Sequence, residues 1–443
     1  MMQSLLLRRE PFGGVLAQRD GEKVKFLNYT GYEITRGIAQ GLDDDEIVND
    51  ILSKFEVSEI ELVRKDISNF RSMISNVDRW PTSRHSLEED KDRTSFSVPT
   101  LSAPLDLHWE ITKRCNLYCR HCFNRSSMKM IEPCLEQIRS VINELEAIRL
   151  RSIVISGGEP LMRKDLKTIL EWVRPMTSII NLSTNATLIT DDNSSWFPDL
   201  VDCANVSLDA GNKLAYEMFR GRKGSFDRCI RGLRSLIKMD IPVAIQTTIS
   251  RFNIDYLDEL ANLIIGEGVT TWIVRLPISS GRAIDNRSDF LSRKEIVEKE
   301  QMLSEFRKQY ESEFERLSIG VNLMWSYRAP YSRMQNRDRI ISCAAGTVLV
   351  ALLADGKLAP CPLFADTNFK SDVVWNKGFL DQWKSASCLN AMRSLRLRDI
   401  QQCFHCAEVE KTCGTGCRAK SYLSGNLLNP DPDCGYLGTV RPP

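Results

Sequence analysis

The sequence predicts an α/β protein whose central unit is a parallel β-sheet curled into an incomplete (β/α)6 barrel. Short apolar runs typical of strands alternate with amphipathic helical patterns between residues 104 and 325. Six such runs lie at residues 105–112, 152–156, 179–183, 204–209, 243–249 and 272–276. The charged pattern at 292–316 is predicted to be the last barrel helix. Functional side chains should gather at the carboxyl ends of the strands, where such barrels place their sites.

Further units flank the predicted barrel. Residues 1–80 are predicted to form a small winged-helix-like α+β domain, with a hairpin at 14–28 around the Asp20-Gly21 turn. Helical patterns follow, the last opening with a capping box at Ser58; they lie at 32–40, 44–55 and 58–74. Residues 81–103 lose periodicity and are predicted to be a linker. Residues 326–443 are rich in cysteine and form the last predicted domain.

The composition excludes several classes of function. The chain has 443 residues and a formal net charge of +1, so no global field draws nucleic acid or an anionic membrane. Residues 1–80 hold eleven Lys and Arg against fourteen Asp and Glu, the wrong sign for binding DNA. The amino-terminal apolar run is too short for a signal peptide, and no stretch approaches about 18 apolar residues. Most of the 14 cysteines fall into metal-type groups, so a reduced, cytoplasmic protein is predicted.

Three cysteines stand close together directly after the first predicted strand. The stretch 115–122 reads CysAsnLeuTyrCysArgHisCys, with thiols at Cys115, Cys119 and Cys122. Three thiolates are one fewer than structural zinc or an ordinary ferredoxin cluster takes. A [4Fe–4S] cube held by three cysteines keeps one iron open for a substrate or cofactor. The alternatives are a structural zinc site or a chance group of buried cysteines, although zinc spacings come as pairs of CxxC.

This spacing resembles the CxxxCxxC signature of the radical SAM enzymes. The resemblance implies that the three cysteines hold a [4Fe–4S] cluster, whose open iron chelates the amino and carboxylate groups of S-adenosylmethionine (SAM). Electron transfer from that cluster then cleaves SAM to methionine and a 5′-deoxyadenosyl radical. The cofactor-binding residues implied by the resemblance are His121, Ser156, Gly157, Gly158, Glu159, Pro160, Asn185, Ser207, Asp209 and Arg220.

The implied cofactor residues have distinct expected roles. The GlyGlyGluPro stretch at 157–160 follows the second predicted strand, where glycines allow close backbone approach, and is expected to hold the SAM amino group. His121 is expected beside the adenine, and the polar groups that end the third and fourth strands beside the ribose. Arg220 is expected to pair with the SAM carboxylate. The candidate catalytic residues for moving a proton are Glu110, Asp209 and Arg275.

Seven cysteines in the carboxy-terminal region resemble the SPASM extension of radical SAM peptide maturases. The resemblance implies two auxiliary clusters, both expected to be [4Fe–4S]. The implied ligands of the outer cluster are Cys403, Cys406, Cys413 and Cys434, and those of the inner cluster are Cys343, Cys361 and Cys417. A fourth ligand of the inner cluster is not visible, and six residues rather than five separate the second and third outer cysteines. Small buried hydrophobic side chains are predicted for Cys134, Cys203, Cys229 and Cys388.

The predicted front domain resembles the peptide-recognition element of ribosomal peptide pathways, which holds a leader peptide as an added strand at a sheet edge. The sequence therefore predicts a radical SAM oxidoreductase that binds a ribosomally made precursor peptide by its leader and modifies the core by hydrogen abstraction. Segments resemble subtilosin-type thioether synthases at 219–226 and mycofactocin maturases at 275–282 and 425–434. Thioether formation, carbon–carbon crosslinking and oxidative decarboxylation therefore all stay open. The implied electron donor is a reductase or a flavodoxin- or ferredoxin-type protein.

Two other functions stay open on the sequence. One is a radical SAM enzyme that acts on a small molecule or a haem precursor, and this function leaves the front domain unexplained. The other is a non-catalytic iron–sulfur electron carrier, which leaves the GlyGlyGluPro stretch without a purpose.

Overall fold

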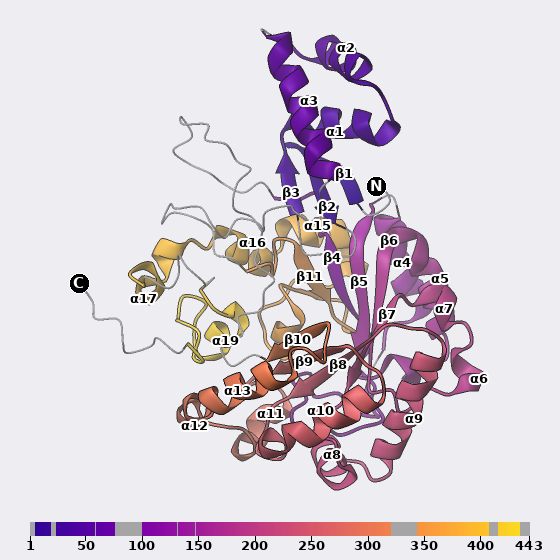
Figure 1. The fold of residues 1–443 in the computed structure, drawn as a ribbon, viewed down its shortest axis with the longest axis vertical. Helices are drawn as coiled ribbons and strands as arrows, with labels where there is room; N and C mark the ends of the chain where they lie inside the picture. The colour runs from indigo at the N-terminus through magenta and orange to yellow at the C-terminus, as the bar shows by residue number, and fades with distance from the viewer. Residues whose placement is uncertain are drawn as a thin grey trace.

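Two β-sheets organise the molecule. The structure is a computed structural model that describes residues 5–18, 24–57, 59–75, 100–130, 132–146, 148–319, 343–406 and 415–434 (Figure 1). Within these ranges, a three-stranded sheet has the order β1-β2-β3, and a nine-stranded sheet has the order β10-β9-β8-β7-β6-β5-β4-β11-β12. None of the described helices is long and apolar enough to cross a membrane.

The front unit combines the small sheet with three helices and projects from one end of the molecule (Figure 1, indigo). The sheet is antiparallel and consists of β1 (Leu5–Glu10), β2 (Gly13–Gln18) and β3 (Val24–Leu27). The helices are α1 (Tyr29–Gln40), α2 (Asp44–Lys54) and α3 (Ile60–Ser75). The predicted hairpin and helices are thus present, and β1 is an additional strand. The predicted turn at 20–21 and the capping box at Ser58 lie outside the described residues.

The small sheet packs directly against the barrel. Leu6, Val15 and Ala17 belong to the same buried apolar cluster as the barrel core. The buried Arg8 donates to the carbonyl oxygens of residues 103 and 104, at 2.7 and 2.9 Å, and pairs with Glu10 at 2.7 Å. Glu10 in turn accepts from the backbone N–H of residue 102 at 2.7 Å. The front unit is therefore anchored to the backbone that enters the first barrel strand.

All six predicted barrel strands are present and neighbouring strands pair in parallel. They are β4 (Asp106–Thr112), β5 (Leu150–Gly157), β6 (Thr177–Thr184), β7 (Cys203–Ser207), β8 (Val243–Thr248) and β9 (Thr271–Arg275). Helices that pack apolar side chains on the sheet are α4 (Leu135–Leu145), α5 (Leu166–Val173), α9 (Ser225–Lys238) and α10 (Leu257–Gly266). Along β4 the buried Leu107 and Trp109 join this core, so His108 and Glu110 point to the opposite, inner side of the sheet.

The prediction of one long helix at 292–316 is wrong. The structure has α12 (Arg293–Glu298) and α13 (Glu300–Tyr310), followed by β10 (Arg316–Ile319), which pairs in parallel with β9. The many Lys and Glu residues led to the prediction of a helix. The last residues of the segment, 316–319, instead add a strand to the sheet edge, because Leu317 and Ile319 pack on the core there. The barrel therefore has one more parallel strand than the sequence predicted.

The carboxy-terminal region shares the barrel sheet. β11 (Leu349–Leu352) pairs in parallel with β4 and antiparallel with β12 (Leu358–Ala359), and a turn at Gly356, with φ +79°, joins β11 to β12. The α-helices not yet given are α6 (Asp191–Ser194), α7 (Phe197–Leu200), α8 (Lys213–Arg220), α11 (Arg282–Asp285), α14 (Val374–Lys377), α15 (Phe379–Ser385), α16 (Ser387–Ser394), α17 (Gln401–Phe404) and α19 (Arg418–Leu423). The 3-10 helices are η3 (Pro160–Met162), η4 (Arg174–Met176), η5 (Ile254–Tyr256), η6 (Arg287–Asp289), η7 (Pro362–Phe364) and η8 (Leu397–Asp399).

Candidate active site

The loop at 115–122, called the cluster loop below, leaves the carboxyl end of β4 with its thiols largely buried. Cys115 and Cys119 are 7% and 8% exposed, and Cys122 is half-buried. Burial raises the pKa of Cys115 to about 12, and the neighbouring thiol of Cys119 adds to the shift. Thiolates in this place therefore need a positive partner, which a metal cluster supplies. Three N–H groups already point at sulfur: that of residue 117 and that of the Asn185 side chain at Cys115, at 3.4 and 4.0 Å, and that of Arg220 at Cys119, at 3.6 Å.

Two glycines at the end of β5 hold the entrance of the cluster loop. Gly157 has φ +144°, and a Cβ there would lie 2.0 Å from the carbonyl oxygen of Thr112. A Cβ on Gly158 would lie 2.2 Å from the carbonyl oxygen of Arg114. The N–H of Gly158 donates to Thr112 at 2.9 Å, and that of Glu159 to Arg114 at 2.8 Å. These glycines therefore allow close contact between two backbone segments of the chain, the end of β5 and residues 112–114.

The Glu159 side chain turns into the protein and braces the end of β6. It is fully buried and accepts hydrogen bonds from the Thr184 hydroxyl and the Asn185 backbone N–H, both at 2.7 Å. Burial raises its pKa to about 7, although these hydrogen bonds favour the charged form. Pro160 follows as the first residue of η3. Glu159 thus fixes the position of Asn185.

Asn185 joins the cluster loop to the end of β6. Its Nδ2 donates to Asn116 Oδ1 at 2.9 Å, and its Oδ1 accepts from the Thr187 hydroxyl at 2.6 Å. Asn116 completes the ring by donating to the same hydroxyl at 2.8 Å. Asn116 and Thr187 were missed by the sequence reasoning, although Asn116 directly follows the first cysteine of the motif.

Three predicted residues meet beside the second cysteine. The Arg220 guanidinium lies 2.6 Å from Asp209 Oδ2, and both residues are at most 5% exposed. Although burial opposes the charge, Asp209 and Cys119 raise the pKa of Arg220. His121 stacks on Phe219 with 4.4 Å between ring centroids, and burial lowers its pKa to about 4. His121 is therefore a neutral flat ring, beside an arginine that stays charged.

This arrangement fits the cofactor pair that the cysteine motif implies. Within the described residues, His121 Nδ1 and Arg220 Nε are buried with no hydrogen-bond partner. A neutral ring with an unused nitrogen suits a purine, and an arginine nitrogen suits a carboxylate. The predicted Ser207 ends β7 and is half-buried. It belongs to the same end of the sheet as the cluster loop, because parallel strands present their carboxyl ends together.

The inner side of the barrel sheet carries a second set of polar residues. The Ser156 hydroxyl lies 2.5 Å from His108 Nε2, and burial together with Arg275 lowers the pKa of His108 to about 4. Burial raises the pKa of Glu110 to about 7, and Asn124 opposes the shift. Burial and the charge of Arg316 lower the pKa of Arg275 to about 10. The candidates Glu110 and Arg275 thus share the barrel interior with Ser156, whereas Asp209 stands with Arg220. His108 was missed, although its alternation with the apolar residues of β4 could have revealed it.

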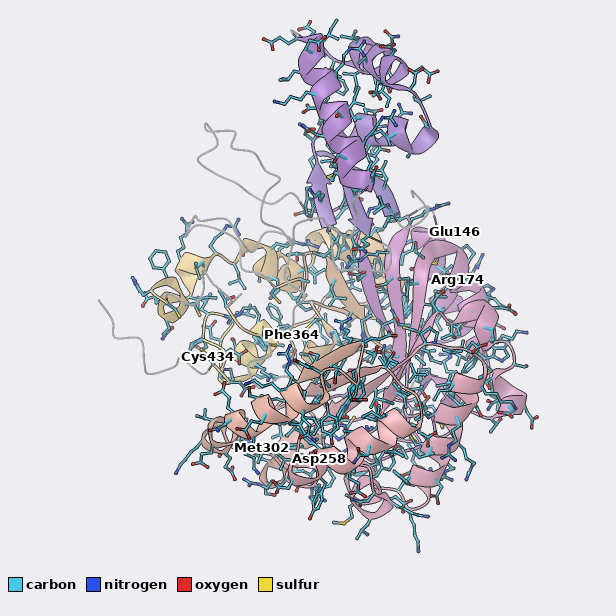
Figure 2. All side chains as sticks on the ribbon, in the orientation of Figure 1. Glu146, Arg174, Asp258, Met302, Phe364 and Cys434 are labelled. Atoms are coloured by element: carbon cyan, nitrogen blue, oxygen red, sulfur yellow. The ribbon has the colours of Figure 1, made fainter. Side chains whose placement is uncertain are left out.

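Five of the seven cysteines predicted to hold auxiliary clusters lie in or against a separate small apolar core. Buried residues of this core include Phe364 and Ala351, and five cysteines belong to it or pack against it, namely Cys343, Cys361, Cys403, Cys406 and Cys417. Burial raises the pKa of Cys361 well above its usual value, and the neighbouring Cys417 and Cys343 thiols add to the shift. Figure 2 labels Cys434 and Phe364 on this side of the molecule. Cys413 lies outside the described residues.

The other cysteines divide into three environments. Cys229 and Cys388 are buried, as predicted, and Cys388 shares the apolar face of α16 with Leu389 and Met392. Cys203 is half-buried on β7 and donates to the Asn181 side chain. The prediction for Cys134 is wrong, because this residue is exposed at the amino-terminal cap of α4. Among the described residues, no three His, Cys, Asp or Glu side chains are grouped closely enough for a single metal ion.

Comparison with known proteins identifies the class of this enzyme. The profile of the radical SAM superfamily matches residues 109–264, from β4 to α10. The mycofactocin maturase MftC of Mycobacterium tuberculosis is 30% identical over 340 residues, which cover 75% of this chain and 83% of that protein. The chain therefore belongs to the radical SAM superfamily and is a radical SAM enzyme. This membership implies SAM and a [4Fe–4S] cluster as cofactors.

Other relatives differ in how much of the chain they cover. The AdoMet-dependent heme synthase of Methanosarcina barkeri is 28% identical over 371 residues, covering 76% of this chain and 98% of that protein. The structure of Streptococcus suis SuiB bound to S-adenosylmethionine has a TM-score of 0.68 at 17% identity and covers 98% of this chain and 99% of that chain. The fold of SuiB thus has counterparts for nearly the whole molecule, including its front unit.

Proposed function

We propose that this enzyme is a peptide maturase that binds a ribosomally made precursor peptide by its leader and modifies the core. The observation that carries the proposal is the combination of a barrel related to MftC with a front unit that the fold of SuiB also contains. SuiB has also been solved bound to its precursor peptide SuiA. We divide the chain into a winged-helix-like recognition domain at 1–80, a linker at 81–103, the barrel at 104–325 and a SPASM domain at 326–443.

Within the described residues, β3 is an outer strand of the small sheet, and we place the leader beside it. β3 lies at one end of the strand order β1-β2-β3, while β1 carries the arginine that anchors the sheet to the barrel. A leader peptide added beside β3 would extend the sheet without disturbing that anchor. Because Arg8 ties the sheet to the backbone before β4, the core of the peptide would start beside the barrel.

The cluster loop and its neighbours form the proposed SAM site. Cys115, Cys119 and Cys122 would hold the cluster, and Arg220 and His121 would bind the cofactor carboxylate and adenine. When bound, the cluster and SAM supply a 5′-deoxyadenosyl radical that can take a hydrogen atom from a substrate. Glu110, with its raised pKa and position inside the barrel, would accept the proton that bond formation releases. In the barrel, the protein's own residues orient the substrate and exclude water.

The carboxy-terminal cysteines would hold two auxiliary clusters. These clusters would take up the electron that the substrate radical loses after hydrogen abstraction. Cys343, Cys361 and Cys417 would serve the inner cluster and the remaining SPASM cysteines the outer one. Asp431 accepts from the backbone N–H of Cys417 at 2.6 Å and from that of Asp433 at 2.9 Å, so its carboxylate positions this loop. Thioether formation, carbon–carbon crosslinking and oxidative decarboxylation all need such an electron acceptor. A flavodoxin- or ferredoxin-type protein or a reductase would supply the electron that starts each turnover.

The test is an anaerobic assay with a short precursor peptide encoded beside the gene. Reconstituted enzyme, SAM and dithionite should convert the peptide to a product that has lost two hydrogens, or carbon dioxide and two hydrogens. A peptide without its leader should react far more slowly, and an unrelated peptide of the same composition is the control. Absence of any peptide product, together with turnover of a haem precursor, would favour the second candidate, a haem-precursor enzyme. The 28% identity to a heme synthase supports that candidate.

A further inference from the structure

The turn after β9, residues 280–285 and called the strap below, lies directly against the cluster loop. The backbone N–H of Arg282 donates to the carbonyl oxygen of Cys122 at 2.9 Å, and the Ser280 hydroxyl donates to that of Phe123 at 3.3 Å. Gly281 has φ +59°, and a Cβ there would lie 2.3 Å from the Cys122 carbonyl oxygen. Only glycine fits this contact without moving the cluster loop.

The Arg282 side chain spans the cluster loop. It is 5% exposed, and its Nε donates to the carbonyl oxygen of Cys119 at 2.9 Å. Its Nη1 donates to the carbonyl oxygen of Ser126 at 2.7 Å. The guanidinium also lies 4.1 Å from the ring centroid of Tyr118. One planar cation therefore fixes backbone on both sides of Cys122 and places a buried positive charge next to the predicted cluster.

The strap also contacts the auxiliary region. The N–H of Gly281 donates to Asp366 Oδ2 at 3.1 Å, and Arg125 donates to the same oxygen at 3.2 Å. Arg125 pairs in addition with Asp285 of the strap at 2.5 Å. Asp366 lies five residues after Cys361 in the sequence. The strap is thus held between the cluster loop and the loop that carries one auxiliary cysteine.

We propose that Arg282 and Gly281 are positioning residues for the SAM-binding cluster, and that Asp366 holds them in register with the auxiliary region. The proposal rests on the proposed assignment of the cluster to Cys115, Cys119 and Cys122. The potential of an iron–sulfur cluster depends on nearby charge and on hydrogen bonds around its ligands. A buried arginine favours the reduced cluster, because reduction adds negative charge, and so makes reduction of the cluster by dithionite or a protein electron donor easier.

The main experiment compares Arg282→Gln with Arg282→Lys in anaerobically reconstituted protein. The midpoint potential of the SAM-binding cluster should fall in Arg282→Gln, and dithionite-driven SAM cleavage should fall by about 10- to 100-fold. Arg282→Lys should restore the potential, because it keeps the charge, but restore the rate only in part, because it lacks the planar fork. Arg234→Gln is the matched control, since Arg234 is an exposed arginine paired with Glu267 at 2.7 Å. A wild-type potential and rate in Arg282→Gln would overturn the proposal.

Two further variants keep the result independent of folding defects. Gly281→Ala should slow SAM cleavage in the same way as Arg282→Gln, while Ala at the exposed neighbour Ser279 should change nothing. Asp366→Asn should shift the electron paramagnetic resonance signal of the SAM-binding cluster, although the residue lies in the auxiliary region. An unchanged signal would overturn the role of Asp366. If Arg282→Gln unfolds at a lower temperature than Arg234→Gln, its potential and rate are compared with those of Arg282→Lys at equal iron content. Equal values in these two variants would overturn the proposal.

The failure of the underlying assignment would look different. If the variant with Ala at 115, 119 and 122 kept all of its iron and still cleaved SAM, the cluster would lie elsewhere whatever Arg282 does. If that variant lost one cluster but Arg282→Gln stayed wild type, the proposed function would stand and only the positioning role would fall.

Discussion

The buried thiols of the cluster loop and those of the carboxy-terminal cysteine region have opposite surroundings, polar in the first and apolar in the second. Around the cluster loop, charged and amide side chains from different strand ends reach sulfur or the loop backbone, as Arg220, Arg282 and Asn185 do. Around the carboxy-terminal cysteines, the neighbours are mainly apolar and aromatic, with the tilted rings of Phe364 and Phe369 in contact at 5.3 Å between centroids. Polar neighbours suit a group that binds an ionic cofactor, whereas an apolar shell suits a group that only exchanges electrons.

Removing the thiols of the cluster loop should have the largest effect. With Cys115, Cys119 and Cys122 replaced by Ala, reconstituted protein should lose about four of about twelve irons, the share of one [4Fe–4S] cluster among three. Cleavage of SAM to 5′-deoxyadenosine should stop, because these thiols hold the cluster to which SAM is proposed to bind. Iron analysis and chromatography of 5′-deoxyadenosine measure both. Continued cleavage would show that the polar loop is not the cofactor site.

The matching change in the apolar region should separate the two functions. Replacing Cys343, Cys361 and Cys417 by Ala should again remove about four irons. Cleavage of SAM in the absence of peptide should persist, since the cluster loop is intact, while formation of the modified peptide should fail. Product analysis by mass spectrometry provides the measurement. Loss of SAM cleavage in a protein with a normal unfolding temperature would mean that the two regions do not work separately.

Glu110 lies where the two regions meet, and its ionisation should lower stability. Burial raises its pKa from 4.5 to about 7, with Lys113, Asp355 and Lys370 as its charged neighbours. A raised carboxyl pKa means that ionisation opposes folding, so this cost develops between about pH 4.5 and pH 7 and reaches about 3 kcal/mol above that range. Glu110→Gln does not ionise and therefore lacks this free-energy cost. Denaturant unfolding at pH 5 and pH 8 should therefore show a smaller loss of stability in the variant, and equal losses would refute the assignment.

Cys388 should give the smallest effect. Its side chain is 2% exposed, belongs to the main apolar core and lies 4.0 Å from the carbonyl oxygen of Leu358. Cys388→Ser should keep the full iron content and product formation, with a loss of stability of about 1 kcal/mol for a buried hydroxyl. A loss of about four irons would instead identify Cys388 as the missing ligand of the inner auxiliary cluster. Iron analysis beside a denaturant titration separates these outcomes.

The structure also changes how the front unit should be tested. The sequence predicted that residues 1–80 form a domain of their own. In the structure, Leu6 and Ala17 belong to the barrel core, and Arg8 donates a hydrogen bond to the backbone before β4. Deleting the unit would therefore expose apolar surface and leave buried carbonyls unpaired. Substitutions confined to β3 are the better probe of leader binding.

Strand number shows where sequence reasoning succeeds and where it stops. The six predicted strands are apolar runs of five to eight residues whose composition predicts burial, and all of them form. β10 and β11 have four residues each, too few for a distinct pattern, and become strands because an existing sheet edge offers hydrogen bonds and a core. The predicted boundary between barrel and SPASM domain is crossed by the pairing of β11 with β4.

The sequence by itself identified the candidate cluster ligands of this enzyme, namely three thiols on one loop and the cysteines that follow the barrel. It also identified the glycines after the second strand. Local spacing carries this information because a loop of eight residues can only place its side chains close together. Only the tertiary structure decided what surrounds those donors. Glu159 faces Asn185 instead of a cofactor, and Arg282 reaches Cys119 from a position 163 residues away. Such contacts depend on how strands curl into a barrel, and no pattern of neighbouring residues encodes that geometry.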